Sequence, residues 1–270
     1  MAETDTRDLP LYQVDAFADH LFAGNPAAVV PLTDWLPDRT LQAIAAENNL
    51  AETAYIVRQD SGTQAHWGLR WFTPKIEVDL CGHATLASAY VIARHLEPGC
   101  DQIRFESRSG PLEVSCEGEK FTLDFPADPP SEFNDGGGVA EAVGLVPQAV
   151  LKGKAKMLAV LENEAAVRAA APDLAKVKAL PSDGLIISAP GAACDLVSRY
   201  FAPHAGIPED PVTGSAHCVL APYWAERFGK TKLTARQLSE RGGALGLELS
   251  RDRVLISGRV VPYLEGRIFV

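Results

Sequence analysis

The sequence lacks any apolar run long enough to cross a membrane, and its first residues lack the basic segment and apolar core of a secretory signal. Positive charge is also scarce, because 25 Lys and Arg stand against 35 Asp and Glu, a formal net charge of −10. Such a surface repels phosphate backbones and anionic lipids. We therefore expect a cytoplasmic protein that binds neither nucleic acid nor membranes.

Metal-binding and nucleophile motifs are absent as well. The five cysteines form no C-x-x-C pair and the six histidines form no H-x-x-x-H pair, which argues against zinc knots, disulfide frameworks and helical metal sites. No G-x-S-x-G motif marks a hydrolase nucleophile. We expect free thiols, no metal and no cofactor.

Short apolar or alternating segments outnumber the helical ones and often follow one another, which predicts the α+β class. The main helices are expected over 39–49, with Asp38 as N-cap, over 82–96 and over 214–229. A Pro- and Gly-rich stretch at 127–138 is the best candidate linker. It suggests an N-terminal lobe over 1–127 and a C-terminal lobe over 128–270, with the final strands free to return to the first lobe.

An internal repeat is the most informative pattern. Residues 70–74 read RWFTP and residues 199–203 read RYFAP, and each block is followed by an Asp-containing loop and a Gly that opens a small-residue helix. These glycines are Gly82 and Gly214. A duplicated fold could reuse this turn for packing alone, or it could bring two helix N-termini to one cleft.

Helix N-termini carry unpaired amides and the positive end of the helix dipole, so two of them in one cleft would hold a carboxylate. His83 and Ser215 follow the two glycines, and Asp210 precedes the second helix. Each of these side chains could instead be an ordinary cap.

Two further groups could move protons. Glu52 stands at the start of an apolar strand, where partial desolvation suits a general base near neutral pH, although a solvated Glu is the simpler interpretation. Cys81 could be a thiolate whose pKa is lowered at a helix N-terminus, or a buried apolar residue. The matching loop at 210–213 has no second thiol.

These motifs together resemble the PhzF family of phenazine-biosynthesis-like isomerases. The resemblance rests on VDAF at 14–17, FAGNPAAV at 22–29, NLAETA at 49–54, EVDLCGHAT at 77–85, FAP at 201–203 and EDPVTGSAH at 209–217. One departure is the glycine run at 242–246, which is followed by Leu-Glu where the family has Arg-Pro.

The resemblance implies the diaminopimelate-epimerase fold: two pseudo-twofold-related lobes, each a curled β-sheet around a central helix, with the active site between them. It also implies a cofactor-independent isomerase that transfers a proton on a small carboxylate, and it allows a homodimer. The implied catalytic residues are Glu52, His83 and Asp210, with Cys81 as a secondary acid or base. The implied substrate-binding residues are Asn25, Gly82, Ala84, Gly214, Ser215 and Ala216.

Two alternatives stay open. A racemase or epimerase could use Glu52 on one face of the substrate and Cys81 or Asp210 on the other. A non-catalytic member of the fold could keep the anion site and bind a small molecule or a protein.

Overall fold

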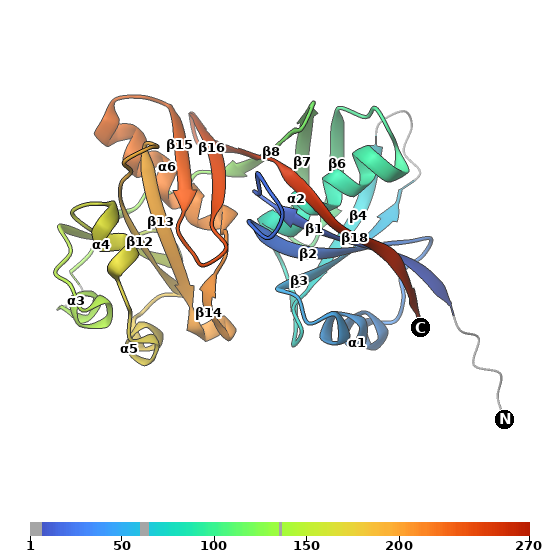
Figure 1. Ribbon diagram of the computed structural model, residues 1–270, viewed down its shortest axis with the longest axis horizontal. Coiled ribbons are helices and arrows are strands. Elements are labelled where there is room, and N and C mark those ends of the chain that lie inside the picture. Colours follow the sequence, from blue (N-terminus) through green and yellow to red (C-terminus); the bar gives the residue numbers. More distant parts are fainter. Residues whose placement is uncertain (1–6, 60–64, 135–136) are drawn as a thin grey trace. The chain divides into compact units, whose positions relative to one another are not determined.

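The computed structural model describes residues 7–59, 65–134 and 137–270, and the chain forms two compact units (Figure 1). Unit 1 combines Met1–Leu123 with Gly258–Val270, and unit 2 is Asp124–Ser257. The chain passes between the units within β8 (Lys120–Pro126) and at the end of β17 (Arg253–Gly258). No helix in the described part of the chain has the length and apolar character needed to cross a membrane.

Unit 1 is a mixed sheet packed around a helix. Its helical elements are α1 (Asp38–Asn48), α2 (Gly82–Val91) and a π-helical turn, Ile92–Leu96. Its strands, besides the start of β8, are β1 (Asp8–Ala16), β2 (Asn25–Leu32), β3 (Glu52–Arg58), β4 (Ala65–Phe72), β5 (Glu77–Val78), β6 (Gln102–Ser107), β7 (Gly110–Glu117) and β18 (Val260–Phe269).

The central helix of unit 1 is α2. Its small residues let strands approach from several sides, and α2 packs against β1, β2 and β3 (Figure 1). Eight of its ten residues are buried, as expected of a helix that is apolar around its whole circumference. α1 differs, because only Leu41, Ile44 and Ala45 are buried and its other face meets solvent.

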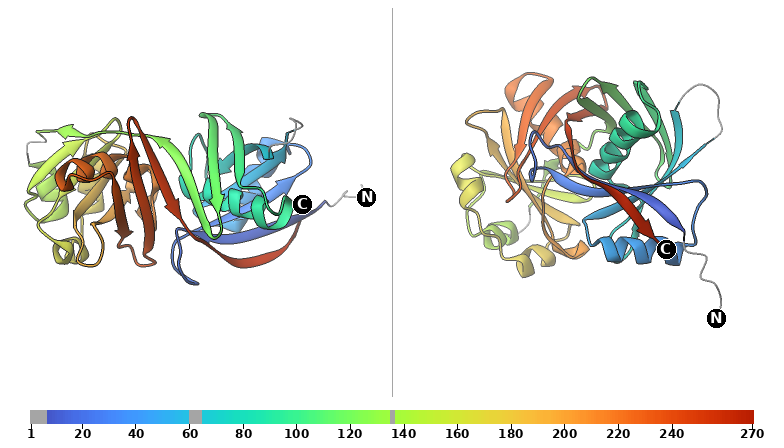
Figure 2. Two further views of the ribbon diagram at one scale, coloured as in Figure 1. Left: turned by 90° about the horizontal axis from the view of Figure 1, so that it is seen from above. Right: turned by 45° about the vertical axis from the view of Figure 1, so that its right-hand side comes forward.

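The ends of the described chain are held together in unit 1. β1 pairs antiparallel with β18 along its whole length, so that Asp8 lies opposite Phe269, and the two strands run side by side (Figure 2). The side chain of Arg267 reaches the carboxylate of Asp8 across this ladder. The C-terminal strand is thereby part of the sheet that begins with β1.

Unit 2 has its own core and its own central helix, α6 (Gly214–Phe228), ten of whose residues are buried. Its other helices are α3 (Gly138–Val143), α4 (Glu164–Ala169), α5 (Leu174–Ala179) and a 3₁₀ turn, Pro203–Ala205. Its strands, besides β17, are β9 (Ser131–Glu132), β10 (Ala149–Lys152), β11 (Lys156–Val160), β12 (Gly184–Pro190), β13 (Leu196–Ala202), β14 (Ile207–Asp210), β15 (Lys232–Gln237) and β16 (Gly243–Ser250).

The internal repeat expected from the sequence is present in the strand pairing. In unit 1, β2 is parallel to β3, β3 antiparallel to β4, and β4 parallel to β6. In unit 2, β11, β12, β13 and β15 repeat this pattern in the same order. In both units the central helix follows a short strand, β5 or β14, that stands in the sequence between the third and fourth strands of this series.

The repeated Arg has the same partner type in both units. Arg70 donates two hydrogen bonds of 2.7 Å to Glu77, and Arg199 donates bonds of 2.7 and 2.8 Å to Glu209. Such two-bond Arg–carboxylate pairs fix geometry as well as charge. Each pair ties the R-aromatic-F strand to the short strand that leads toward the central helix.

Several expectations from the sequence need correction. Pro37, not Asp38, is the N-cap of α1; Asp38 is its first residue, and its carboxylate accepts a bond from Arg70 instead of capping. The last turn of the helix expected over 82–96 is π-helical. The stretch at 127–138 lies in unit 2 and contains β9, while its residues 135 and 136 lie outside the described residues.

Candidate active site

Glu52 is the first residue of β3, and 8% of its surface is exposed. Just before it, Asn49 ends α1 with a left-handed φ of 50°, which turns the chain toward the strand. β3 then runs parallel to β2 with Glu52 opposite Ala27. The strand start expected from the sequence is therefore present, and it removes the carboxylate from bulk water.

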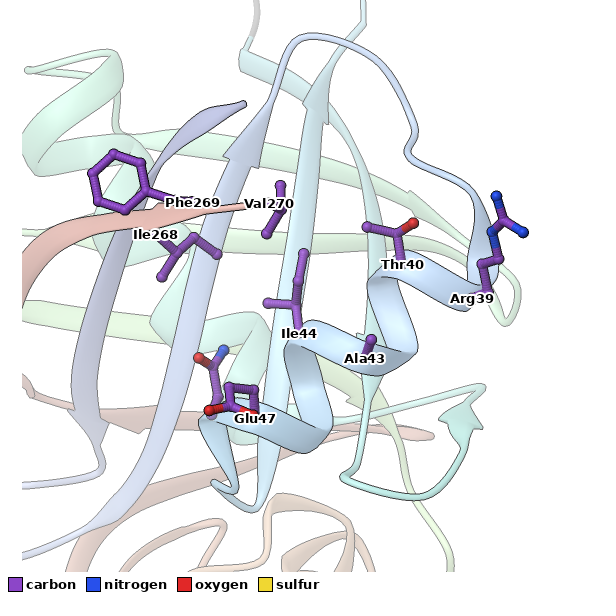
Figure 3. Close-up of a pocket in the computed structure, with 9 residues that line it drawn as sticks. Arg39, Thr40, Ala43, Ile44, Glu47, Ile268, Phe269 and Val270 are labelled. Carbon is purple, nitrogen blue, oxygen red and sulfur yellow. The ribbon is translucent and has the colours of Figure 1, made fainter. Parts of the chain in front are cut away.

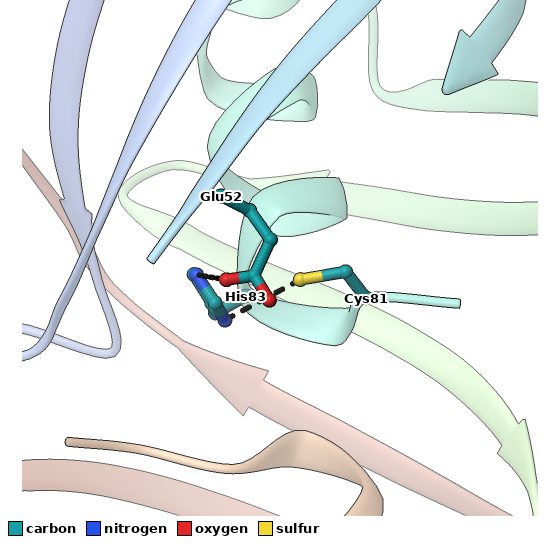
Figure 4. Close-up of side chains that lie close together, drawn as sticks. All are labelled: Glu52, Cys81 and His83. Atoms are coloured by element: carbon teal, nitrogen blue, oxygen red, sulfur yellow. Dashed lines mark hydrogen bonds and ion pairs between the residues drawn. The ribbon is translucent and has the colours of Figure 1, made fainter. Parts of the chain in front are cut away.

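His83 and Cys81 meet Glu52 at the N-terminus of α2. Cys81 is the N-cap of this helix and Gly82 its first residue. His83 Nε2 lies 3.1 Å from Glu52 Oε2, and His83 Nδ1 lies 3.5 Å from Cys81 Sγ (Figure 4). Both His83 and Cys81 are buried. Glu52 thus forms one buried cluster with two residues that follow it 29 and 31 positions later in the sequence.

Asn25 approaches the same imidazole from the start of β2. Its side-chain Nδ2 lies 3.2 Å from His83 Nδ1, and the residue is fully buried. The preceding Gly24 has a φ of +72°, and a Cβ on it would lie 2.4 Å from the carbonyl oxygen of Ala16. Only glycine fits there, so the turn that delivers Asn25 depends on it.

The environment of His83 favours its charged form. Burial alone lowers the pKa of His83, but interactions with Cys81 and Glu52 raise it, and the pKa ends well above its ordinary value. The Glu52 carboxylate supplies a negative charge at hydrogen-bond distance. The contact with Glu52 therefore favours the protonated form of His83.

The expectation that the helix N-terminus lowers the pKa of Cys81 is wrong. Burial raises the pKa of this thiol, and the neighbouring Glu52 raises it further. Desolvation of a thiolate outweighs the favourable helix dipole here. Cys81 is accordingly a neutral thiol that can donate a proton, and not a thiolate base.

In unit 2, Asp210 is the last residue of β14 and is largely buried. Thr213, the N-cap of α6, donates its hydroxyl hydrogen bond to Asp210 Oδ2 at 2.5 Å. This contact ties the carboxylate to the start of the central helix.

Gln237, at the end of β15, fixes the loop between Asp210 and Thr213. Its Oε1 accepts a bond from the Thr213 amide at 2.9 Å, and its Nε2 donates to the Asp210 carbonyl at 2.7 Å. Sequence reasoning did not single out Gln237, because it lies 24 residues or more from both partners and no local motif marks it.

The predicted binding residues of the two helices occupy their first turns. Gly82 and Ala84 begin α2, and Gly214, Ser215 and Ala216 begin α6. At neither helix does the N-cap side chain accept a hydrogen bond from the first-turn amides. Binding of one carboxylate by both N-termini stays a prediction.

His217, in the second turn of α6, gives a prediction on stability. The ring is completely buried, Nδ1 donates to the Thr213 carbonyl at 2.8 Å, and burial lowers the pKa of His217 to about 4. Between pH 6.5 and 4 the unfolded chain therefore binds a proton that the folded chain does not, so stability falls as pH falls. From pH 7 to 5 this group should cost about 2 kcal/mol.

Urea unfolding at both pH values tests this prediction. The His217→Gln variant should lose that part of the acid sensitivity, and His204→Gln, which changes an exposed histidine, should keep it. Equal pH dependence in His217→Gln and the parent protein would contradict the assignment.

A separate cavity of about 730 Å³ lies in unit 1 between α1 and the end of β18 (Figure 3). None of the predicted catalytic or binding residues lines it. Its lining consists of Arg39, Thr40, Ala43, Ile44, Glu47, Asn48, Ile268, Phe269 and Val270. This cavity and the Glu52 cluster are therefore separate features of unit 1.

Comparisons with known proteins agree with this architecture. An uncharacterized isomerase of Pseudomonas aeruginosa is 49% identical over 97% of this chain and 99% of its own. The crystal structure of a PhzF-family phenazine biosynthesis protein from Enterococcus faecalis matches with a TM-score of 0.94 and 42% identity, over 98% of this chain and all of the other.

A more distant structure places the fold in a wider group. A hydroxyproline epimerase from Agrobacterium vitis has a TM-score of 0.62 at 10% identity, covering 98% of this chain and 93% of its own. This likeness concerns the fold alone and agrees with the expected diaminopimelate-epimerase-like α+β class. The family model for phenazine biosynthesis-like proteins matches residues 14–266. The chain therefore belongs to the PhzC-PhzF family of phenazine biosynthesis-like proteins and is a PhzF-like isomerase.

Proposed function

We propose that this isomerase moves a proton between two carbons of one small carboxylate, without a cofactor, and that Glu52 is the acid and base. The observation that carries the proposal is the buried Glu52–His83 pair at the start of β3 and α2, 3.1 Å apart. A positioned carboxylate can serve as a general base when it reaches the substrate proton, and the contact with His83 holds Glu52 in one orientation.

In this mechanism Glu52 removes a proton from a carbon made acidic by neighbouring unsaturation or a carboxylate. His83, whose Nε2 lies 3.1 Å from Glu52 Oε2, holds the Glu52 side chain in place before the reaction. The protonated Glu52 then returns the proton to a second carbon of the same ligand, so protons and electrons balance within the substrate.

Negative charge develops on the substrate when the proton leaves. The amides of Gly82, Ala84, Gly214, Ser215 and Ala216 are the groups we propose to stabilise it, in the manner of an oxyanion hole. In unit 1, Asn25 lies beside His83, and in unit 2, Asp210 lies beside the start of α6; both side chains are proposed to act on the substrate.

A solvent-exchange screen tests the reaction class. The protein is incubated in D₂O with two sets of probes, α-amino acids and β,γ-unsaturated carboxylates, and proton NMR follows each carbon. A double-bond shift with deuterium at a new carbon supports the proposal. No exchange and no isomerisation in either set, with ligand binding intact, would favour a binding-only protein.

A racemase or epimerase is the second candidate, and one observation favours it. Cys81 is a neutral thiol whose Sγ lies 3.5 Å from His83 Nδ1, so a second group that can donate a proton lies in the same cluster as Glu52. The same screen separates the two reactions. A racemase places deuterium on the original carbon and inverts it, whereas the proton shift leaves deuterium on another carbon.

Ser215→Ala is a milder test of the binding residues. Loss of the hydroxyl should weaken the carboxylate found in the screen by about 1 kcal/mol, the typical net worth of one hydrogen bond. Calorimetric titration measures the change, with Ser182→Ala, a serine that bonds to the Gly184 carbonyl, as control. Unchanged affinity in Ser215→Ala would remove Ser215 from the site.

A further inference from the structure

Glu52, Cys81 and His83 each offer one ligand atom, and these three atoms all lie within 4.8 Å of one another. They come from two rigid elements, the first residue of β3 and the first turn of α2 with its N-cap. The three side chains are buried, with 5 to 8% of their surface exposed. A site built on such elements holds its ligands with little rearrangement.

The donor set selects the kind of ion. A thiolate, an imidazole nitrogen and a carboxylate oxygen suit Zn²⁺, whereas Mg²⁺ and Ca²⁺ prefer oxygen ligands. Three protein ligands leave the fourth tetrahedral position to water or to another small molecule.

Two polar atoms of the cluster are also available to bind a cation. Glu52 Oε2 and His83 Nε2 are buried and lie 3.1 Å apart as an ion pair, and apart from this contact neither atom has a hydrogen-bond partner among the described residues. A bound cation would satisfy the carboxylate oxygen and one imidazole nitrogen directly.

We propose that Glu52, Cys81 and His83 form a reversible, inhibitory site for Zn²⁺ and for the chemically similar Cd²⁺. On binding, the metal displaces the proton of Cys81 and that of His83 to solvent and forms bonds to sulfur, nitrogen and oxygen. Inhibition rests on the proposed role of Glu52, because the metal occupies the base. Binding of the metal does not rest on that role.

Cadmium titration of metal-free protein provides the test, since a Cd–thiolate bond gives an ultraviolet charge-transfer band. The band should saturate at one Cd²⁺ per chain, disappear in Cys81→Ser and persist in Cys218→Ser, which removes another buried thiol. Zn²⁺ should displace the Cd²⁺. Glu52→Gln and His83→Ala should each weaken binding by more than roughly tenfold, the loss seen when only an outer partner of a metal ligand is removed.

Failure of a variant to fold does not block the test, because zinc X-ray absorption of the unaltered protein reports the ligands. One sulfur at about 2.3 Å with nitrogen and oxygen neighbours is expected. Three results would overturn the proposal. They are a zinc coordination shell without sulfur, a Cd–thiolate band that persists in Cys81→Ser, and a metal affinity that stays unchanged in Glu52→Gln and His83→Ala. Sulfur-bound zinc without loss of activity would uphold binding at the site and refute the role of Glu52.

Discussion

Glu52→Gln should lower turnover by about 10² to 10⁴, the contribution of a general base. Glutamine keeps the shape of the side chain but cannot take a proton, so the carbon acid stays protonated. Ligand affinity should change by only a few fold, because the proposed carboxylate-binding amides are untouched. Turnover and affinity are measured separately, by initial rates and by calorimetric titration of the substrate found in the exchange screen.

A matched control is available in the same unit. Glu106 also faces a histidine, with Oε1 3.3 Å from His66 Nε2, but this pair is more exposed. Glu106→Gln removes a Glu–His pair outside the site and should leave turnover unchanged. Equal turnover in Glu52→Gln and Glu106→Gln would assign the proton transfer to another group, with Cys81 and Asp210 next.

Gln237→Leu should destabilise unit 2 by about 2 to 6 kcal/mol, because two polar groups lose a buried partner at roughly 1 to 3 kcal/mol each. The groups are the Thr213 amide and the Asp210 carbonyl, bonded to Gln237 at 2.9 and 2.7 Å. Urea unfolding measures the loss. Turnover should also fall, because the loop that carries Asp210 and leads into α6 loses its hydrogen bonds to Gln237.

Gln237→Glu tests the donor to Asp210. It keeps an acceptor for the Thr213 amide but places a carboxylate oxygen against the Asp210 carbonyl in a buried site, so it should also be less stable than the parent protein. A Gln237→Leu variant as stable as the parent protein would show that the hydrogen bonds of Gln237 contribute nothing to stability. Gln237 is therefore a positioning residue, and its substitution should reduce kcat more than it raises KM.

Elements with a marked hydrophobic pattern, or with a high content of small apolar residues, could be predicted from the sequence. β3 and the small-residue helices α2 and α6 lie where the apolar pattern placed them, because their burial leaves a clear apolar signal in the sequence. Short elements such as β14 and α5 were missed, since four to six residues give no period to detect. The sequence predicts Asp38 as the N-cap of α1, but the N-cap is Pro37, one position earlier.

The candidate site could be predicted only in part. Glu52, His83 and Asn25 were singled out by motif, and their contact follows from strand pairing that brings β2, β3 and α2 together. The raised pKa of Cys81 could not be foreseen, because it depends on burial and on a carboxylate 29 residues away. For the same reason, a search for short metal-binding motifs would not detect the proposed metal site, because Glu52 lies 29 residues before Cys81.

The measurement that tests the central claim most directly is deuterium incorporation from D₂O, resolved carbon by carbon, in the parent protein and in Glu52→Gln. We expect the parent protein to place deuterium at the carbon that receives the proton. In Glu52→Gln that incorporation should be abolished while the ligand still binds. Incorporation at the parent rate in Glu52→Gln would contradict the claim that Glu52 carries the proton.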